Sequence, residues 1–212
     1  MMSMCQMVEE ELKKALIKTR LIENWENCGW NRSGRTDKGV SAFKQIASLI
    51  VRSTGGHENA LCATDGSGDI TAAEKQELPY IKMLNGTLPK SIRVLAWAPV
   101  PEDFSARHQC TQRTYTYLFP KGNFDIQACD LLVGEHDFRN FCRIDMNKER
   151  VEMSYVRTIN YARISAISDD ISSPYDFFEL TIKAKGFLWH QIRCIMALLC
   201  EIGCQNEQPQ VI

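Results

Sequence analysis

The run GRTDKGVSAF, residues 34–43, is the segment of this chain best suited to chemistry. It places the carboxylate of Asp37 between Arg35 and Lys38 and encloses all three between glycines. Cationic neighbours keep a carboxylate ionised, which suits covalent or acid–base catalysis, and glycines permit a sharp turn and the close approach of a substrate. The same residues also fit a surface turn with a solvated charge pair. The remaining motifs favour the catalytic interpretation.

Two further segments combine aromatic rings with cations. They are FSARHQCTQRTYTY, residues 104–117, and KAKGFLWHQIR, residues 183–193. Aromatic planes beside cations suit single-stranded or extruded nucleotides. Each feature also has a structural explanation, because a strand tyrosine often packs in a core and an Arg–Asp pair can be purely structural. The candidate residues in these segments are Arg107, Arg113, Tyr115, Phe187, His190 and Arg193.

Positive charge is unevenly distributed along the 212 residues, although the net charge is only −1. Residues 28–52 carry a balance of +4, and residues 105–121 and 183–193 each carry +3. If these windows converge, they form a basic cleft on an acidic body, which suits a polyanion. Scattered, solvated charge is the alternative.

The composition describes an intracellular globular protein. Hydrophobic residues make up 44% and charged residues 24%; no run approaches the roughly 20 apolar residues of a membrane span, and the N-terminus lacks the pattern of a signal peptide. The nine cysteines have irregular spacing without a CxxC pair, so we expect reduced thiols, in the nucleus or the cytoplasm, and no metal site. No phosphate-binding loop is present, so we expect no nucleotide cofactor.

Helical and strand patterns alternate along the chain. Short connections such as residues 168–174 favour antiparallel pairing, so we expect an α+β architecture of two lobes, residues 1–100 and 101–212, with a hinge near Pro99 and Pro101. Residues 53–75 are polar and glycine-rich and indicate a surface insertion. We expect helices over residues 7–22, 77–86, 126–134 and 187–202, and strands over 40–51, 91–100, 113–119, 156–167 and 175–184.

Taken together and in this order, the motifs resemble the TruA family of tRNA pseudouridine synthases. GRTDKGVSAF is similar to the family's nucleophile loop, FSARHQCTQRTYTY to its tyrosine motif, and GFLWHQIRCIMALLCEIG to its arginine motif. DFRNFC, residues 137–142, resembles the DF-x-x-F segment. The resemblance runs from about residue 8 to residue 203. Motif spacing and the sequence around CRIDMNKERV are closest to the eukaryotic branch, which acts on uridines 38 and 39 of the anticodon arm.

The resemblance implies a fold and a set of roles. It implies two pseudo-symmetric lobes with a mixed, mainly antiparallel sheet and flanking helices around a central basic cleft. Asp37 would be the nucleophile, Tyr115 would stack on the target uracil, and Arg193 would pair with the aspartate. The reaction is redox-neutral and needs no cofactor or metal; the partner is tRNA, and a homodimer is a candidate assembly. Substrate binding would fall to Arg35, Arg107, Arg113, Phe187 and His190.

Two other functions remain open from the sequence. Relative to the family pattern, the chain begins almost directly with the first helix and ends soon after Gly203, so we expect terminal strands to be missing. A catalytically impaired tRNA-binding fragment of the same fold is therefore an alternative to the enzyme. A nucleotide hydrolase is the other, but the chain lacks the lysine–hydroxyl pair of a Walker loop.

Overall fold

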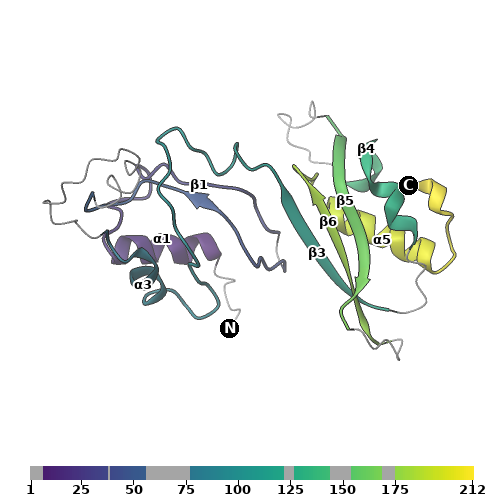
Figure 1. The fold of residues 1–212 in the computed structure, drawn as a ribbon, viewed down its shortest axis with the longest axis horizontal. Helices are drawn as coiled ribbons and strands as arrows, with labels where there is room; N and C mark the ends of the chain where they lie inside the picture. Colours follow the sequence, from purple (N-terminus) through teal and green to yellow (C-terminus); the bar gives the residue numbers. More distant parts are fainter. Residues whose placement is uncertain (1–6, 38, 56–76, 122–126, 144–153, 169–174) are drawn as a thin grey trace, which may run out of the picture. The chain divides into compact units, whose positions relative to one another are not determined.

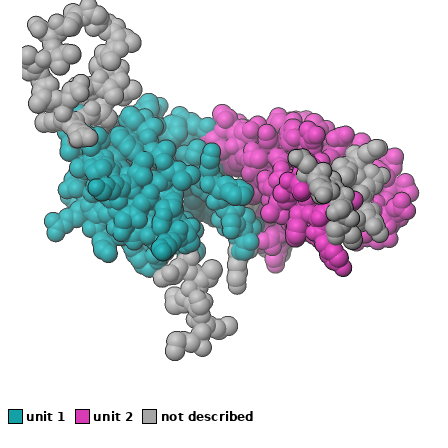
Figure 2. Space-filling model, turned by 60° about the horizontal axis from the view of Figure 1, so that its bottom comes forward, with its two compact units in different colours: residues 1–109 teal, residues 110–212 magenta. Residues whose placement is uncertain are grey.

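The fold is α+β, with antiparallel sheets and few helices, as the sequence predicts. The computed structural model describes residues 7–37, 39–55, 77–121, 127–143, 154–168 and 175–212. Two compact units divide the chain, residues 1–109 and residues 110–212 (Figure 2). Most of the expected insertion at residues 53–75, the turn at 169–174 and Lys38 lie outside the described residues.

Unit 1 packs two helices around a small apolar core. Helix α1, Val8–Lys18, buries Ala15 and Leu16, and helix α3, Tyr80–Asn85, buries Tyr80 and Leu84 in the same core (Figure 1). Helix α1 has three glutamates in its first turn and Lys18 in its last turn, and these charges complement the helix dipole. Both helices were predicted, and both are confirmed, although α1 ends at Lys18 and not near residue 22.

The small sheet of unit 1 holds the hairpin that carries the GRTDKGVSAF run. Strand β1, Asn31–Arg32, pairs antiparallel with β2, Ala47–Ser48. The strand predicted over residues 40–51 is therefore wrong for most of its length, and the described residues contain no strand over 91–100. Apolar, β-branched composition favours a strand, but a strand also requires a hydrogen-bonding partner.

Unit 2 is a four-stranded antiparallel sheet in the order β3-β6-β5-β4, with helix α5 on one face (Figure 1). On the central strand β6, Phe178, Leu180, Ile182 and Ala184 are all buried and alternate with half-buried or exposed residues. This period of two is the pattern of a strand with one face in a core. The strands of this sheet are β3 Arg113–Pro120, β4 Gly134–Asp137, β5 Val156–Ala166 and β6 Phe177–Ala184.

The core of unit 2 lies between that sheet face and α5, Gln191–Gly203. The helix buries Ile195, Met196, Leu199 and Ile202 in it, and each such side chain stabilises the fold by about 1.5–3 kcal/mol. Strands β3, β5 and β6 confirm the prediction, whereas α5 begins at Gln191, later than predicted, and β4 was not predicted. The helix predicted over 126–134 is a 3₁₀ helix within the described residues. The 3₁₀ helices are η1 Gln127–Leu132, η2 Arg139–Phe141 and η3 Pro209–Val211.

Candidate active site

Asp37 lies at the tip of the hairpin between β1 and β2. The hairpin is closed at its base, because the Ser33 N–H donates to the Ile46 carbonyl at 2.8 Å and the Ser33 hydroxyl donates to Gln45 Oε1 at 3.0 Å. At the tip, the Val40 N–H donates to the Asp37 carbonyl at 3.1 Å. The resulting turn exposes the Asp37 carboxylate to solvent.

Gly39 sets the conformation of this turn. Its φ is +81° at the third position of the four-residue turn that begins at Asp37, where type II and type I′ turns both need a positive φ. A residue with a Cβ adopts this conformation only at a cost. The glycine in the motif therefore has a local structural reason, which is to aim the loop that presents the carboxylate.

Guanidinium groups gather at the base of the same hairpin. The Arg107 backbone N–H and the Ser105 hydroxyl both donate to Asn31 Oδ1 at 3.2 Å, which fixes the 105–107 segment beside β1. Burial and then the positive charges of Arg35 and Arg107 lower the pKa of Arg32. Arg32 also forms an ion pair with Glu9 of α1. Two of the three positively charged windows of the sequence thus contribute arginines to one region of unit 1.

Tyr115 lies on β3 of unit 2 with its ring against Phe187. The two rings meet edge to face, with centroids 5.2 Å apart and an interplanar angle of 84°. Tyr115 is half-buried at the margin of the core, so its ring is held in place while part of it stays accessible. Beside it, the Arg113 guanidinium donates to the Lys185 carbonyl, which ties β3 to the segment that follows β6.

The entrance to α5 positions Arg193 by a tight turn. His190 precedes the helix with a left-handed φ of +61°, an uncommon conformation for a residue with a Cβ that tends to occur where a fold needs an abrupt change of direction. Gln191 is only 1% exposed, and its Oε1 accepts the Leu188 N–H at 2.7 Å. Arg193 lies in the first turn of the helix and is exposed.

The predicted residues thus fall into two groups. Unit 1 brings the carboxylate loop together with cations, and unit 2 brings aromatic rings together with cations near the start of α5. The unit 1 group is Arg35, Asp37 and Arg107, and the unit 2 group is Arg113, Tyr115, Phe187, His190 and Arg193.

One pair of residues at the entrance to α5 was not predicted from the sequence. The Arg143 guanidinium lies over the Trp189 ring at 4.9 Å from the centroid, and the Arg143 N–H donates to the Trp189 carbonyl at 2.9 Å. Trp189 belongs to a recognised motif, but nothing local in the sequence connects it with Arg143. Only the packing of η2 against α5 brings the two together.

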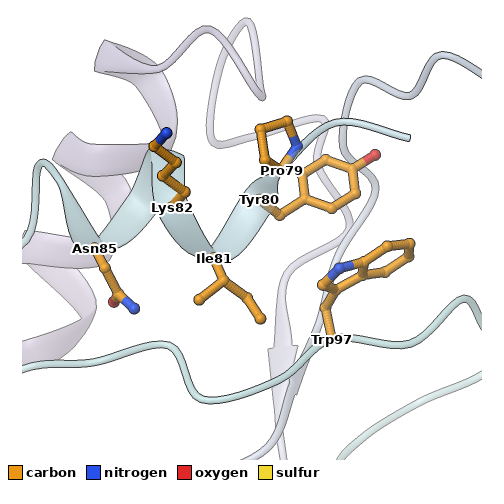
Figure 3. A pocket seen from close by; sticks show the side chains of 6 residues that line it. All are labelled: Pro79, Tyr80, Ile81, Lys82, Asn85 and Trp97. Atoms are coloured by element: carbon orange, nitrogen blue, oxygen red, sulfur yellow. The ribbon is translucent and has the colours of Figure 1, made fainter. Parts of the chain in front are cut away.

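A shallow pocket in unit 1 is lined by none of the predicted site residues (Figure 3). It has a volume of about 380 Å³ and is lined by Pro79, Tyr80, Ile81, Lys82, Asn85 and Trp97. The single proton of the Tyr80 hydroxyl is shared between two acceptors, the Arg52 carbonyl at 3.0 Å and Glu77 Oε1 at 2.9 Å. Burial and the Glu77 carboxylate raise the pKa of Tyr80 to about 12. Tyr80 therefore stays protonated at neutral pH and serves as a structural tie.

Neither a metal-binding cluster nor a membrane-spanning helix occurs among the described residues. No group of three or more His, Cys, Asp or Glu side chains there could hold a metal ion. No helix in that part of the chain is both long and apolar enough to cross a membrane.

The known proteins that this chain resembles share one description, tRNA pseudouridine synthase. A family model described as tRNA pseudouridine synthase matches residues 128–212. A probable tRNA pseudouridine synthase of Caenorhabditis elegans is 49% identical over 97% of this chain and 53% of its own length. The tRNA pseudouridine(38/39) synthases of Bos taurus and Saccharomyces cerevisiae are 41% and 36% identical, each over 97% of this chain and 44% of their own length. The chain thus spans about half the length of these relatives.

Proposed function

Because the chain belongs to the TruA family of tRNA pseudouridine synthases, we propose that the protein isomerises uridine to pseudouridine at positions 38 and 39 of tRNA. The names of the relatives from Bos taurus and Saccharomyces cerevisiae give those positions for those proteins. The observation that carries the proposal is the exposed carboxylate of Asp37, held at the tip of a glycine-shaped turn in a unit rich in guanidinium groups.

The proposed chemistry exchanges one bond to the ribose for another. The N1–C1′ glycosidic bond breaks, the uracil rotates, and a C5–C1′ bond forms; C5 then loses its proton and N1 gains one, so that the product is an isomer of the substrate. Asp37 stabilises the positive charge that develops on the ribose, either by covalent attack or as an ion, as carboxylates do in glycoside hydrolysis. Neither course needs a redox partner.

We assign Tyr115 and Arg193 to the target nucleotide. Tyr115 would stack on the uracil and take part in removal of the C5 proton, and its contact with Phe187 supports this role because it holds the ring in orientation. Arg193 pairs with Asp37 and keeps the carboxylate ionised and oriented. Arg35 assists extrusion of the target nucleotide, because a stacked base hides its glycosidic bond.

We further propose that the two units are pseudo-symmetric lobes on either side of a basic cleft that holds tRNA. The arginines near the hairpin in unit 1 and those near α5 in unit 2 support this arrangement. Arg107, Arg113 and His190 would contact phosphates, which dominate affinity for nucleic acids. A homodimer is compatible with the proposal, and a reducing compartment, the nucleus or the cytoplasm, suits the free cysteines.

Site mapping on tRNA tests the function directly. Unmodified tRNA transcripts are incubated with the protein, treated with a carbodiimide that leaves a stable adduct on pseudouridine, and read by primer extension. We expect a stop one nucleotide 3′ of position 38 or 39, and none when cytidine replaces those uridines. Binding of tRNA without any stop would instead identify a non-catalytic RNA-binding module and refute the proposed activity.

A further inference from the structure

Trp189 is an unusual residue for the entrance of a packed helix. Its neighbours Phe187, Leu188 and Ile192 all pack against the core of unit 2, whereas Trp189 keeps 40% of its surface exposed. A large aromatic side chain normally contributes most when it is buried. An indole left at the surface beside a predicted catalytic arginine therefore suggests a binding role.

The position of the indole is fixed by its backbone and its neighbours. The Trp189 carbonyl accepts the Arg143 N–H at 2.9 Å. Directly after it, His190 adopts its left-handed conformation, and its ring lies 5.0 Å from the indole, centroid to centroid. The buried Gln191 closes the 188–191 turn that contains Trp189, because its Oε1 accepts the Leu188 N–H at 2.7 Å. Such a preorganised side chain loses little conformational freedom when a ligand binds.

The Arg143 guanidinium extends this aromatic surface and gives it charge. It lies 4.9 Å from the Trp189 ring centroid, in cation–π distance, and Arg143 is itself exposed. Planar guanidinium and indole groups are both surfaces on which unpaired bases stack in RNA complexes. A positively charged stack favours a nucleotide over an uncharged apolar peptide.

This stack lies at the same end of α5 as Arg193. Cys142, next to Arg143 in sequence, has its pKa raised first by burial and then by the nearby Cys194, which follows Arg193. Packing of η2 against α5 agrees with this proximity. Tyr115 contacts Phe187, which is two residues before Trp189, so a base on the stack would lie near, and not at, the position proposed for the target uracil on Tyr115.

We propose that the Arg143–Trp189 stack receives an unpaired base of the tRNA substrate that neighbours the target nucleotide. This inference rests on the proposed function and adds a second base-binding position to it. Stacking tolerates any base, so the position would supply affinity and register with little sequence preference. The Arg143–Trp189 stack would hold the RNA loop while the target nucleotide turns out of its stacked position in the RNA.

Fluorescent RNA tests the stack without any need for turnover. Anticodon stem-loops carry 2-aminopurine at one unpaired loop position at a time, and Asp37→Ala protein is used so that the RNA stays unmodified. We expect one position to be strongly quenched on binding, and Trp189→Ala to remove that quenching and weaken binding by about 5- to 100-fold. Trp189→Phe should retain most of both effects. Arg143→Ala should weaken binding, whereas Tyr175→Ala, which removes an aromatic side chain that is 81% exposed, should not.

Three outcomes would overturn the inference. One is an unchanged quenching pattern and affinity in Trp189→Ala, which would leave the stack as a structural brace or a protein contact. Another is an equal loss at every RNA position together with reduced thermal stability. The third concerns RNA that lacks the base at the quenched position. If Trp189→Ala still binds this abasic RNA more weakly than the wild type does, the tryptophan does not act by stacking on that base. Failure of the proposed function is distinguishable, since it appears as absent pseudouridine with wild-type protein.

Discussion

Replacing Gly39 with alanine should impair catalysis through the backbone alone. Gly39 has a φ of +81°, and a Cβ built on it meets nothing within 4 Å, so no steric clash accompanies the added methyl group. The cost is conformational, about 1–2 kcal/mol for an L-residue in a left-handed conformation. The loop either bears this strain or relaxes to a negative φ, which would move Asp37.

A relaxed loop should lower kcat while the protein stays folded. A displacement of about 1 Å at a reacting group can cost about 100-fold in rate. We therefore expect Gly39→Ala to lower kcat about 10- to 100-fold, while the free energy of unfolding falls by no more than about 2 kcal/mol. Gly39→Asn should lose less, because asparagine tolerates the left-handed region better.

Gly55 provides a matched control within the same unit. It also has a φ of +81° with nothing within 4 Å of a built Cβ, but it lies outside the hairpin. Pseudouridine formation is measured alongside urea unfolding for both alanine variants. Equal turnover losses in the two variants, or a wild-type rate in Gly39→Ala, would refute the argument that this turn aims Asp37.

Three further predictions concern other parts of the chain. Tyr80→Phe should lower the free energy of unfolding by about 1–3 kcal/mol, because the Arg52 carbonyl and the Glu77 carboxylate lose a donor. Because the pKa of Tyr80 is raised to about 12, the stabilisation that the wild-type hydroxyl provides should be complete at neutral pH and should fade as pH rises from 10 towards 12. Urea unfolding at several pH values checks both expectations. Arg107→Ala should reduce the slope of log affinity against log salt by about 0.7–0.9, without unfolding, because the Arg107 backbone and not its side chain ties the segment to the hairpin; an unchanged slope in filter binding would remove it from the phosphate contacts. Arg193→Ala should lower kcat about 100-fold or more and change tRNA affinity little, and a loss confined to affinity would contradict its orienting role.

The sequence predicted elements well wherever periodicity and a partner coincide. Strand β6 alternates buried residues with half-buried or exposed ones and pairs with β5, whose own alternation is interrupted at the register shift between Ile159 and Tyr161. Helix α1 has an amphipathic pattern with charges suited to its dipole. The pattern failed over residues 40–51 and 91–100, where Ile46, Leu95 and Trp97 remain exposed. Composition alone cannot reveal whether a partner strand exists for such segments.

The parts of the site that depend on contacts between segments distant in the sequence could not be predicted. The Asp37 motif indicated an exposed loop on its own, because Gly39 encodes the turn locally. By contrast, the left-handed His190 delays the start of α5 without a glycine to mark it. The stacking of Arg143 on Trp189 depends on η2 lying against α5, a contact that neither local sequence contains.

The most direct test of the central claim is tritium release from tRNA that carries [5-³H]uridine, compared between wild-type protein and Asp37→Asn. Asparagine preserves the size of the side chain and removes its charge, so the variant isolates the carboxylate chemistry. We predict release by the wild type in proportion to pseudouridine formed, and background release by Asp37→Asn with tRNA binding retained. Release by Asp37→Asn at a rate comparable to that of the wild type would contradict the assignment of Asp37 as the catalytic carboxylate.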